Sequence, residues 1–140
     1  MHKFLSTVIC CAIFSLSANV QASEQNLPAE KTEHGVTYVS GGIGSDESNA
    51  MKRAAANYPL ECIFTVKSAG KEIYLADVHV RLSDKQGKVL LDTVSDGPYL
   101  FAKLADGYYR IEAIREGSTK TQSIEIKNGA HKKVVFSWFE

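Results

Sequence analysis

Acidic side chains in or beside the predicted strands are the residues of this chain that come closest to catalytic chemistry. They are Asp77, Asp92, Asp96 and Asp106. Two carboxylates that converge in space can act as acid and base in glycoside hydrolysis. Most acidic residues at strand ends are simply solvated, and the chain has no Gly-x-Ser-x-Gly nucleophile elbow. The sequence therefore predicts no catalytic residue and no enzymatic activity. A small carboxylate-dependent hydrolase is the alternative.

A glycine-rich loop, Gly41-Gly42-Ile43-Gly44, lies between a predicted strand and a predicted helix, which is where a phosphate-binding loop would lie. The third glycine of a dinucleotide fingerprint is missing, because Glu47 occupies that position, and the Lys-Ser/Thr pair of a P-loop is missing too. Asp46 and Glu47 would also place negative charge where the anion should bind. We interpret the loop as a hinge into the helix and predict no cofactor.

The pattern of histidines does not predict a metal site. The histidines beyond residue 22 are far apart and lack the i, i+4 spacing of a helical zinc pair: His34, His79 and His131. We expect His79 to be solvated on the outward face of a strand. Asp92 and Asp96 weakly resemble a calcium loop, but Val94 stands where that loop requires an oxygen ligand.

Aromatic residues could form a binding surface without catalysis. Tyr108 and Tyr109 are neighbours in a predicted strand, so one of them must face outward because side chains alternate along a strand. An outward tyrosine is a suitable contact for a sugar or a protein. The candidate contact surface is a sheet face or the entry to the helix, represented by Asp46, Glu47, Asp96, Tyr99 and Tyr108.

Residues 1–22 have the three-part layout of a secretory signal peptide. Lys3 precedes an apolar run from Phe4 to Leu16, and a short polar stretch leads to Ala22. This run of 13 residues is shorter than the roughly 20 that a membrane span requires. We expect cleavage after Ala22, export, and no stable membrane span after the cleavage.

The composition is that of an ordinary folded domain. Of 140 residues, 44% are hydrophobic, and 16 basic residues balance 16 acidic ones. The balance leaves no excess positive charge for nucleic acid, so no such partner is predicted. Cleavage after Ala22 would leave Cys62 alone, without a partner for an internal disulfide. Its place among apolar residues predicts a buried thiol, with a reactive or dimer-bridging thiol as the alternative.

One helix and a series of strands must position these residues. Residues 23–35 are polar and are predicted to be a flexible leader, and a single domain is expected over residues 36–140. Ser45 followed by two acidic residues is typical of a capped helix start. Pro59 ends the helix near Asn57, so we expect a helix over about residues 45–57.

From Leu60 onward the chain alternates between strand and turn signals. Tight-turn pairs such as Asp106-Gly107 and Asn128-Gly129 separate the strands. The expected strands are seven: 60–67, 74–82, 88–94, 99–104, 108–114, 120–126 and 131–139. Strands at this spacing without helices between them favour an antiparallel sandwich. The predicted fold class is all-β, a seven-strand antiparallel sandwich with one short N-terminal helix.

Residues 96–113, DGPYLFAKLADGYYRIEA, resemble the carboxypeptidase regulatory-like family, in which a strand ends in Leu-Pro-x-Gly and a tyrosine opens the next strand. In this stretch, Ala105 stands where the family usually has the proline of Leu-Pro-x-Gly. Residues 76–82, with Asp84 and Gly87, look like the opening hairpin of that family. The resemblance covers about residues 74–136. It implies a transthyretin-like sandwich that serves as a non-catalytic appendage for stability or contacts. No peptidase zinc ligands carry over.

The whole layout also resembles small exported proteins of Gram-negative bacteria that have no assigned activity, which implies a periplasmic location. The leading hypothesis is a non-catalytic periplasmic binding or interaction module whose partner is a glycan or another envelope protein. The alternatives are the carboxylate-dependent hydrolase and a structural subunit of an envelope assembly. In such a subunit an edge strand would pair with the partner.

Overall fold

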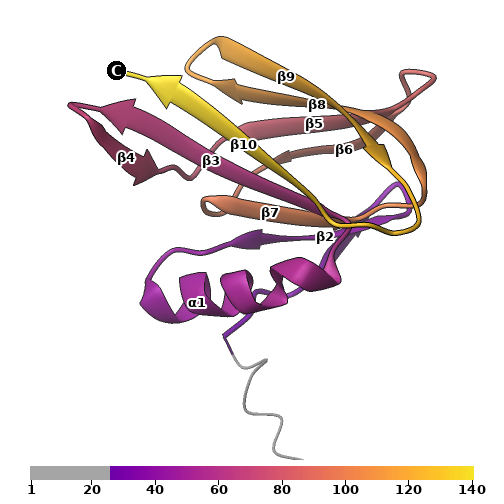
Figure 1. Ribbon diagram of the computed structural model, residues 1–140, viewed down its shortest axis with the longest axis horizontal. Helices are drawn as coiled ribbons and strands as arrows, with labels where there is room; N and C mark the ends of the chain where they lie inside the picture. Colours follow the sequence, from indigo (N-terminus) through magenta and orange to yellow (C-terminus); the bar gives the residue numbers. More distant parts are fainter. Residues whose placement is uncertain (1–25) are drawn as a thin grey trace, which may run out of the picture.

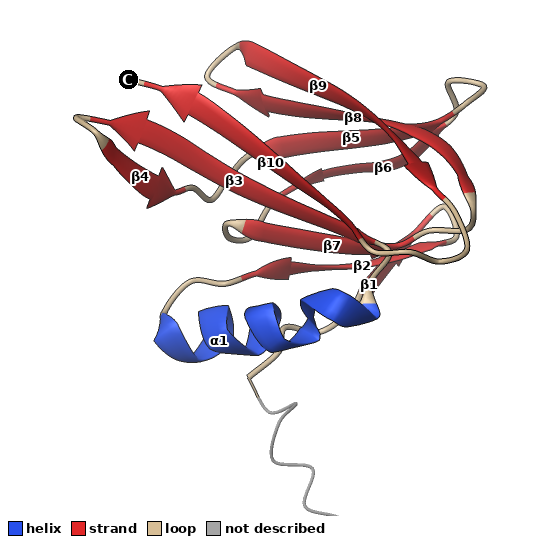
Figure 2. Cartoon of the chain, in the orientation of Figure 1, coloured by secondary structure: helices blue, strands red, loops and turns tan. Residues whose placement is uncertain are grey.

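Two β-sheets face each other across a hydrophobic core, and a helix lies on the outer side of the larger sheet (Figures 1 and 2). This computed structural model describes residues 26–140. The predicted signal peptide, residues 1–22, lies outside the described residues. Within the described part of the chain, no helix has both the length and the apolar character needed to cross a membrane.

The larger sheet contains six strands, five of them in the order β1-β2-β7-β3-β10. The sixth strand, β4, pairs with the second half of β3, beyond the residues that pair with β7. β10 runs parallel to β3, whereas the other pairs of this sheet are antiparallel. The strands are β1 Lys31–Glu33, β2 Val36–Gly41, β3 Leu60–Ser68, β4 Lys71–Tyr74, β7 Tyr99–Lys103 and β10 Lys132–Phe139.

The smaller sheet has four antiparallel strands in the order β6-β5-β8-β9. β8 and β9 form a hairpin whose turn residues, Glu116 and Gly117, have φ angles of 48° and 76°, as expected for a tight hairpin turn. The strands are β5 His79–Asp84, β6 Val89–Val94, β8 Gly107–Arg115 and β9 Ser118–Ile126.

The all-β class with one short helix is confirmed, but the strand count and the pairing differ from the prediction. The described residues form ten strands, and β3 and β10 are parallel rather than antiparallel. The predicted strand 74–82 is interrupted near Asp77, whose φ is 58°, so β4 joins one sheet and β5 the other. Asp106-Gly107 connects β7 to β8 across the two sheets and closes no hairpin.

Part of the segment predicted to be a flexible leader forms a strand. β1 pairs with β2, and the Lys31 ammonium lies 2.9 Å from a carboxylate oxygen of Asp96. The Glu33 carboxylate accepts a hydrogen bond of 3.3 Å from the backbone N–H of Asp92, on β6 of the other sheet. β1 is therefore connected to both sheets.

The main core lies between the sheets and is built by the inward residues of their strands. Phe64 of β3 and Phe136 of β10 stack with ring centres 5.9 Å apart, opposite Leu82 and Ile111 of the smaller sheet. Cys62 is fully buried here, as predicted. Burial, with a smaller contribution from Glu61, raises the pKa of its thiol to about 12. The nucleophilic thiolate is therefore scarce at neutral pH, which argues against the reactive-thiol alternative.

A second apolar cluster fills the space between the helix and the larger sheet: Val39, Met51, Ala55, Tyr58, Ile63, Tyr99 and Phe101. The helix therefore covers the face of β3 opposite Cys62. On this face Glu61 is 8% exposed and Thr65 only 2%. Alternation along the strand separates these two residues from Cys62, but burial of their face depends on a distant element.

The helical segment begins at Ser45 and ends at Asn57, consisting of α1 (Ser45–Ala54) and a short 3-10 turn, η1 (Ala55–Asn57). This matches the range that the sequence predicts. The expected Ser45 cap is wrong, because Gly44 precedes the helix and no side chain caps it. Instead, the Glu47 carboxylate accepts a hydrogen bond of 2.8 Å from the backbone N–H of Gly42, which fastens the first turn to the glycine-rich loop.

Candidate functional site

The outer face of the smaller sheet carries polar and aromatic side chains from three neighbouring strands. On β8, Tyr108, Arg110 and Glu112 alternate with Tyr109 and Ile111, which pack against the core. Residues paired across antiparallel strands share a face. The outward residues of β8 therefore stand beside Arg81 and Ser83 of β5 and beside Thr121, Ser123 and Glu125 of β9.

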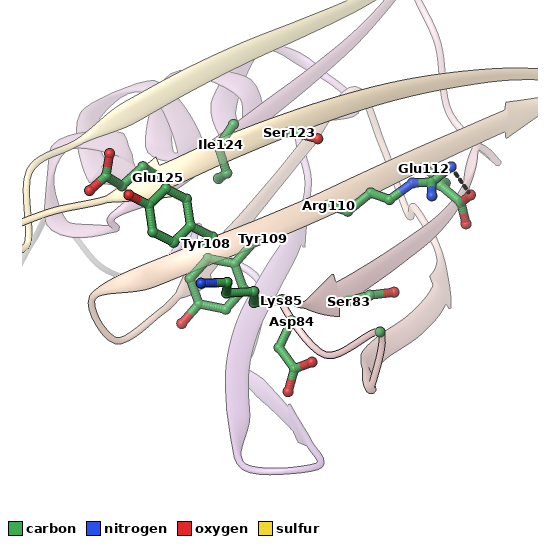
Figure 3. A pocket seen from close by; sticks show the side chains of 11 residues that line it. Ser83, Asp84, Lys85, Tyr108, Tyr109, Arg110, Glu112, Ser123, Ile124 and Glu125 are labelled. Carbon is green, nitrogen blue, oxygen red and sulfur yellow. Dashed lines mark ion pairs between the residues drawn. The ribbon is translucent and has the colours of Figure 1, made fainter.

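A groove of about 640 Å³ lies at the end of the sheet where β8 begins (Figure 3). Its lining combines one open aromatic ring with charged and hydroxyl groups. Tyr108 is 55% exposed, and the Lys85 ammonium lies 5.6 Å from the centre of its ring. A cation–π contact of this kind contributes about 0.5–1 kcal/mol at an exposed site, which favours a defined position for the ring.

The turn between β5 and β6 places Lys85 at the groove. Asp84 Oδ1 accepts hydrogen bonds of 2.9 Å from the backbone N–H groups of both Gln86 and Lys88. The backbone N–H of Gly87 also donates to the carbonyl of Asp84, at 3.0 Å. An aspartate that binds the backbone ahead of it holds a turn in one shape, so the Asp84 side chain is committed to the turn.

Tyr109 forms part of the lining and packs against the core beneath it. Its hydroxyl donates a hydrogen bond of 2.7 Å to the backbone carbonyl of Ala105. Burial, followed by the negative charges of Asp106 and Asp84, raises the pKa of this phenol. The hydroxyl therefore remains a donor at neutral pH and joins the start of β8 to the preceding loop.

A ladder of ion pairs crosses the same face, and two of its residues, Arg110 and Glu112, also line the groove. Arg110 lies 3.2 Å from the Glu112 carboxylate, and Arg81 lies 3.8 Å from Glu112 and 3.4 Å from Asp92. Asp92 also accepts a short hydrogen bond from His79, and this bond is the main reason that the pKa of the Asp92 carboxyl is lowered. His79 is thus paired with a carboxylate rather than only solvated.

These pairings hold two carboxylates of the open face, Asp92 and Glu112, against cationic or histidine side chains. A carboxyl that donates a proton in catalysis needs a raised pKa, whereas the pKa of Asp92 is lowered. Glu112 is held between two arginines. Across the groove, two cationic side chains, Lys85 and Arg110, face three carboxylates, so the lining has mixed charge.

The five residues predicted to mark a contact surface do not come together. Tyr108 borders the groove on the smaller sheet. Asp46 and Glu47 line a different hollow at the start of α1, on the other side of the molecule (Figure 1). Asp96 is paired with Lys31 in the loop between the sheets.

Tyr99 is corrected as a surface candidate, because it is only 2% exposed. Its ring packs on Phe101 and on Tyr74, with centres 5.9 Å apart in each case. Tyr99 also packs against the helix, since it belongs to the apolar cluster that contains Met51 of α1. The tyrosine contributes to packing and is unavailable to a ligand.

The glycine-rich loop at the start of α1 is occupied by the protein's own carboxylate. Glu47 binds the Gly42 N–H, and a Cβ on Gly41 would overlap that carboxylate. An anion at this position would meet the negative charge of Glu47.

Three of the four acidic residues of the hydrolase alternative have separate structural partners. Asp106 accepts hydrogen bonds of 2.9 and 3.0 Å from the backbone N–H groups of Asn128 and Gly129, and these two bonds lower the pKa of its carboxyl. Asp92 pairs with His79, and Asp96 pairs with Lys31.

His131 links the start of β10 to the end of the helical segment. Its Nδ1 lies 2.7 Å from the backbone carbonyl of Tyr58, and its Nε2 lies 2.7 Å from the Glu61 carboxylate. Both ring nitrogens are used within the protein. Among residues 26–140 there is no group of three or more His, Cys, Asp or Glu side chains that could hold a metal ion.

Sequence analysis identified Tyr108 but missed the residues that surround it. The alternation of Tyr108, Arg110 and Glu112 along one strand is a signal that could have identified the outward face of β8. The positions of Lys85 and Glu125 beside Tyr108 could not be predicted in this way, because they depend on the pairing of β8 with β5 and β9.

The chain matches none of the models of known protein families and has no significant match among the curated proteins.

Proposed function

We propose that this protein is a non-catalytic binding module of the bacterial periplasm and that the groove around Tyr108 binds a saccharide. The observation that carries the proposal is the exposed ring of Tyr108 among hydrogen-bonding side chains. The C–H face of a sugar packs well on an aromatic ring, while its hydroxyls need several donors and acceptors. Arg110, Glu112 and Ser123 offer such groups in the lining of the same groove.

The charge of the groove supports a neutral or zwitterionic ligand. Two cationic groups and three carboxylates line it, so a polyanion would find no concentrated positive field. Ligand sites combine an apolar or aromatic surface with a few placed polar groups. The groove has both components on a rigid, hydrogen-bonded sheet.

The fold proposed with this function is a transthyretin-like sandwich. Apart from β1, β2 and the four-residue β4, seven strands remain in two facing sheets, as the resemblance to the carboxypeptidase regulatory-like family implies. The periplasmic location rests on the signal-peptide pattern of residues 1–22. Cell fractionation, with mass spectrometry showing an N-terminus at Ser23, tests the location and the cleavage.

A glycan array of bacterial envelope saccharides, followed by calorimetry with the best-binding oligosaccharide, tests the function. We expect Tyr108→Ala to abolish binding and Arg110→Ala to weaken it. Tyr74→Ala is the matched control, since Tyr74 is 57% exposed but lies on β4 of the larger sheet. The proposal is wrong if no saccharide binds, or if Tyr108→Ala binds as tightly as the unaltered protein.

A further inference from the structure

β10 presents a long unpaired edge. Among residues 26–140, no strand hydrogen-bonds to the side of β10 that faces away from β3. β9 comes near, and Trp138 Nε1 donates to the carbonyl of Ser118 at 3.4 Å. Near Val135, however, a hollow of about 420 Å³ lies between the two strands. An exposed strand edge of this length is a template for pairing with another chain.

The direction of the backbone groups along β10 follows from its two ends. The N–H of Lys132 donates to the carbonyl of Pro59 at 2.7 Å, and the N–H of Glu140 donates to the carbonyl of Lys67 at 2.9 Å. Backbone direction alternates along a strand, so even-numbered residues bind β3. The odd-numbered residues direct both N–H and C=O toward the open edge: Lys133, Val135, Ser137 and Phe139.

We propose that β10 is a dimer interface at which two copies of this chain pair antiparallel, with each Phe136 opposite the other. In this register Lys133 stands opposite Phe139, and Val135 stands opposite Ser137. All four residues with free edge groups then form hydrogen-bonded pairs. A shift of two residues in either direction leaves one of the four opposite a position outside β10. A shift of one residue would place core side chains on the outer face.

The same register brings opposite charges together. Lys132 lies across from Glu140 of the second copy, in a position where side chains of an antiparallel pair are closest. Because of the two-fold symmetry, this ion pair forms twice. Glu140 already contacts Arg115 at 2.6 Å, so its carboxylate is held near the end of β10. This interface lies on the edge of the larger sheet, whereas the groove around Tyr108 lies on the smaller sheet, and the dimer proposal does not rest on saccharide binding.

Blocking the edge tests the proposal directly. Val135→Pro removes an N–H that points to the open edge and leaves the bonds to β3 intact, a position at which strands tolerate proline. In sedimentation velocity over a concentration series, we expect the unaltered protein to reach a dimer. We expect Val135→Pro, with an unchanged circular dichroism spectrum, to raise the dimer dissociation constant about tenfold or more.

Charge reversal provides a second measurement that does not depend on the proline variant folding. Lys132→Glu and Glu140→Lys should each weaken the dimer, and the double variant should dimerise more tightly than either single one. Lys127→Glu, which makes the same charge change outside β10, is the control. Three results would overturn the proposal: a monomer at every concentration, a folded Val135→Pro that dimerises normally, or a double variant no tighter than the single ones.

Discussion

The outer face of the larger sheet lies under α1, whereas the outer face of the smaller sheet is open to solvent. Tyr99 and Tyr108 show the consequence, because both begin or nearly begin a strand and yet are 2% and 55% exposed. The covered face holds an apolar cluster. The open face holds ion pairs and the groove. In this protein, the presence or absence of a covering helix therefore decides whether an outward strand residue is available to a ligand.

The largest expected effect tests the covered face. Phe101 is fully buried, with its ring centre 5.6 Å from that of Tyr58 in the helical layer. Phe101→Ala should lower the free energy of unfolding by about 3–5 kcal/mol, measured by urea denaturation. Ile43→Ala, at a side chain that is 63% exposed, is the control. A loss below about 1 kcal/mol at Phe101 would mean that the layer is loosely packed.

The next effect concerns the loop that leads into β7. A Cβ on Gly97 would overlap the backbone carbonyl of Gly41 at the end of β2. Gly97→Ala must separate these segments, and we expect a loss of about 1–3 kcal/mol in the free energy of unfolding. Thermal denaturation followed by circular dichroism measures it. An unchanged midpoint would show that the two segments are not held together in solution.

On the open face, we expect smaller and pH-dependent effects. The folded chain lowers the pKa of the Asp92 carboxyl from its ordinary 3.8, chiefly through the bond with His79. The unfolded chain therefore takes up this proton more readily. The stabilisation is complete above about pH 4 and is lost as pH falls through the lower folded-state pKa.

Asp92→Asn should accordingly destabilise the protein at pH 7 by at most about 1 kcal/mol, because the carboxylate is 41% exposed and exposed ion pairs contribute little. Urea denaturation of both proteins at a series of pH values measures the difference. It should shrink as the solution becomes acidic. A difference that grows toward low pH would contradict the assignment.

The smallest effect on stability is expected at Tyr108. Its ring is exposed and contacts the Lys85 ammonium, so Tyr108→Ala should change the free energy of unfolding by no more than about 0.5 kcal/mol. This is the change for which we predict loss of saccharide binding. A large destabilisation would place Tyr108 with the packing residues and remove the contrast with Tyr99.

The sequence predicts well those features that depend on neighbouring residues. The helix over residues 45–57 and the outward position of one of the neighbouring residues Tyr108 and Tyr109 follow from local periodicity, and both are observed, with Tyr108 as the outward residue. The burial of Tyr99 and Glu61 could not be predicted in this way. Tyr99 is covered by a helix that lies more than 40 positions earlier in the chain, and alternation carries no information about such a layer.

The division of the strands between the two sheets could not be predicted from local sequence patterns either. Asp106-Gly107 has the composition of a hairpin turn, but Asp106 binds the backbone of Asn128 and Gly129 instead, at the other crossing between the sheets. The parallel pairing of β3 with β10 joins segments more than 70 positions apart. No local pattern specifies a pairing at that distance.

That distance also orders events during biosynthesis. β3 can pair with β10 only after residues 132–139 have been synthesised. Contacts between such distant segments are slow to form, so we expect the β3–β10 pair to be among the last parts of the larger sheet to assemble.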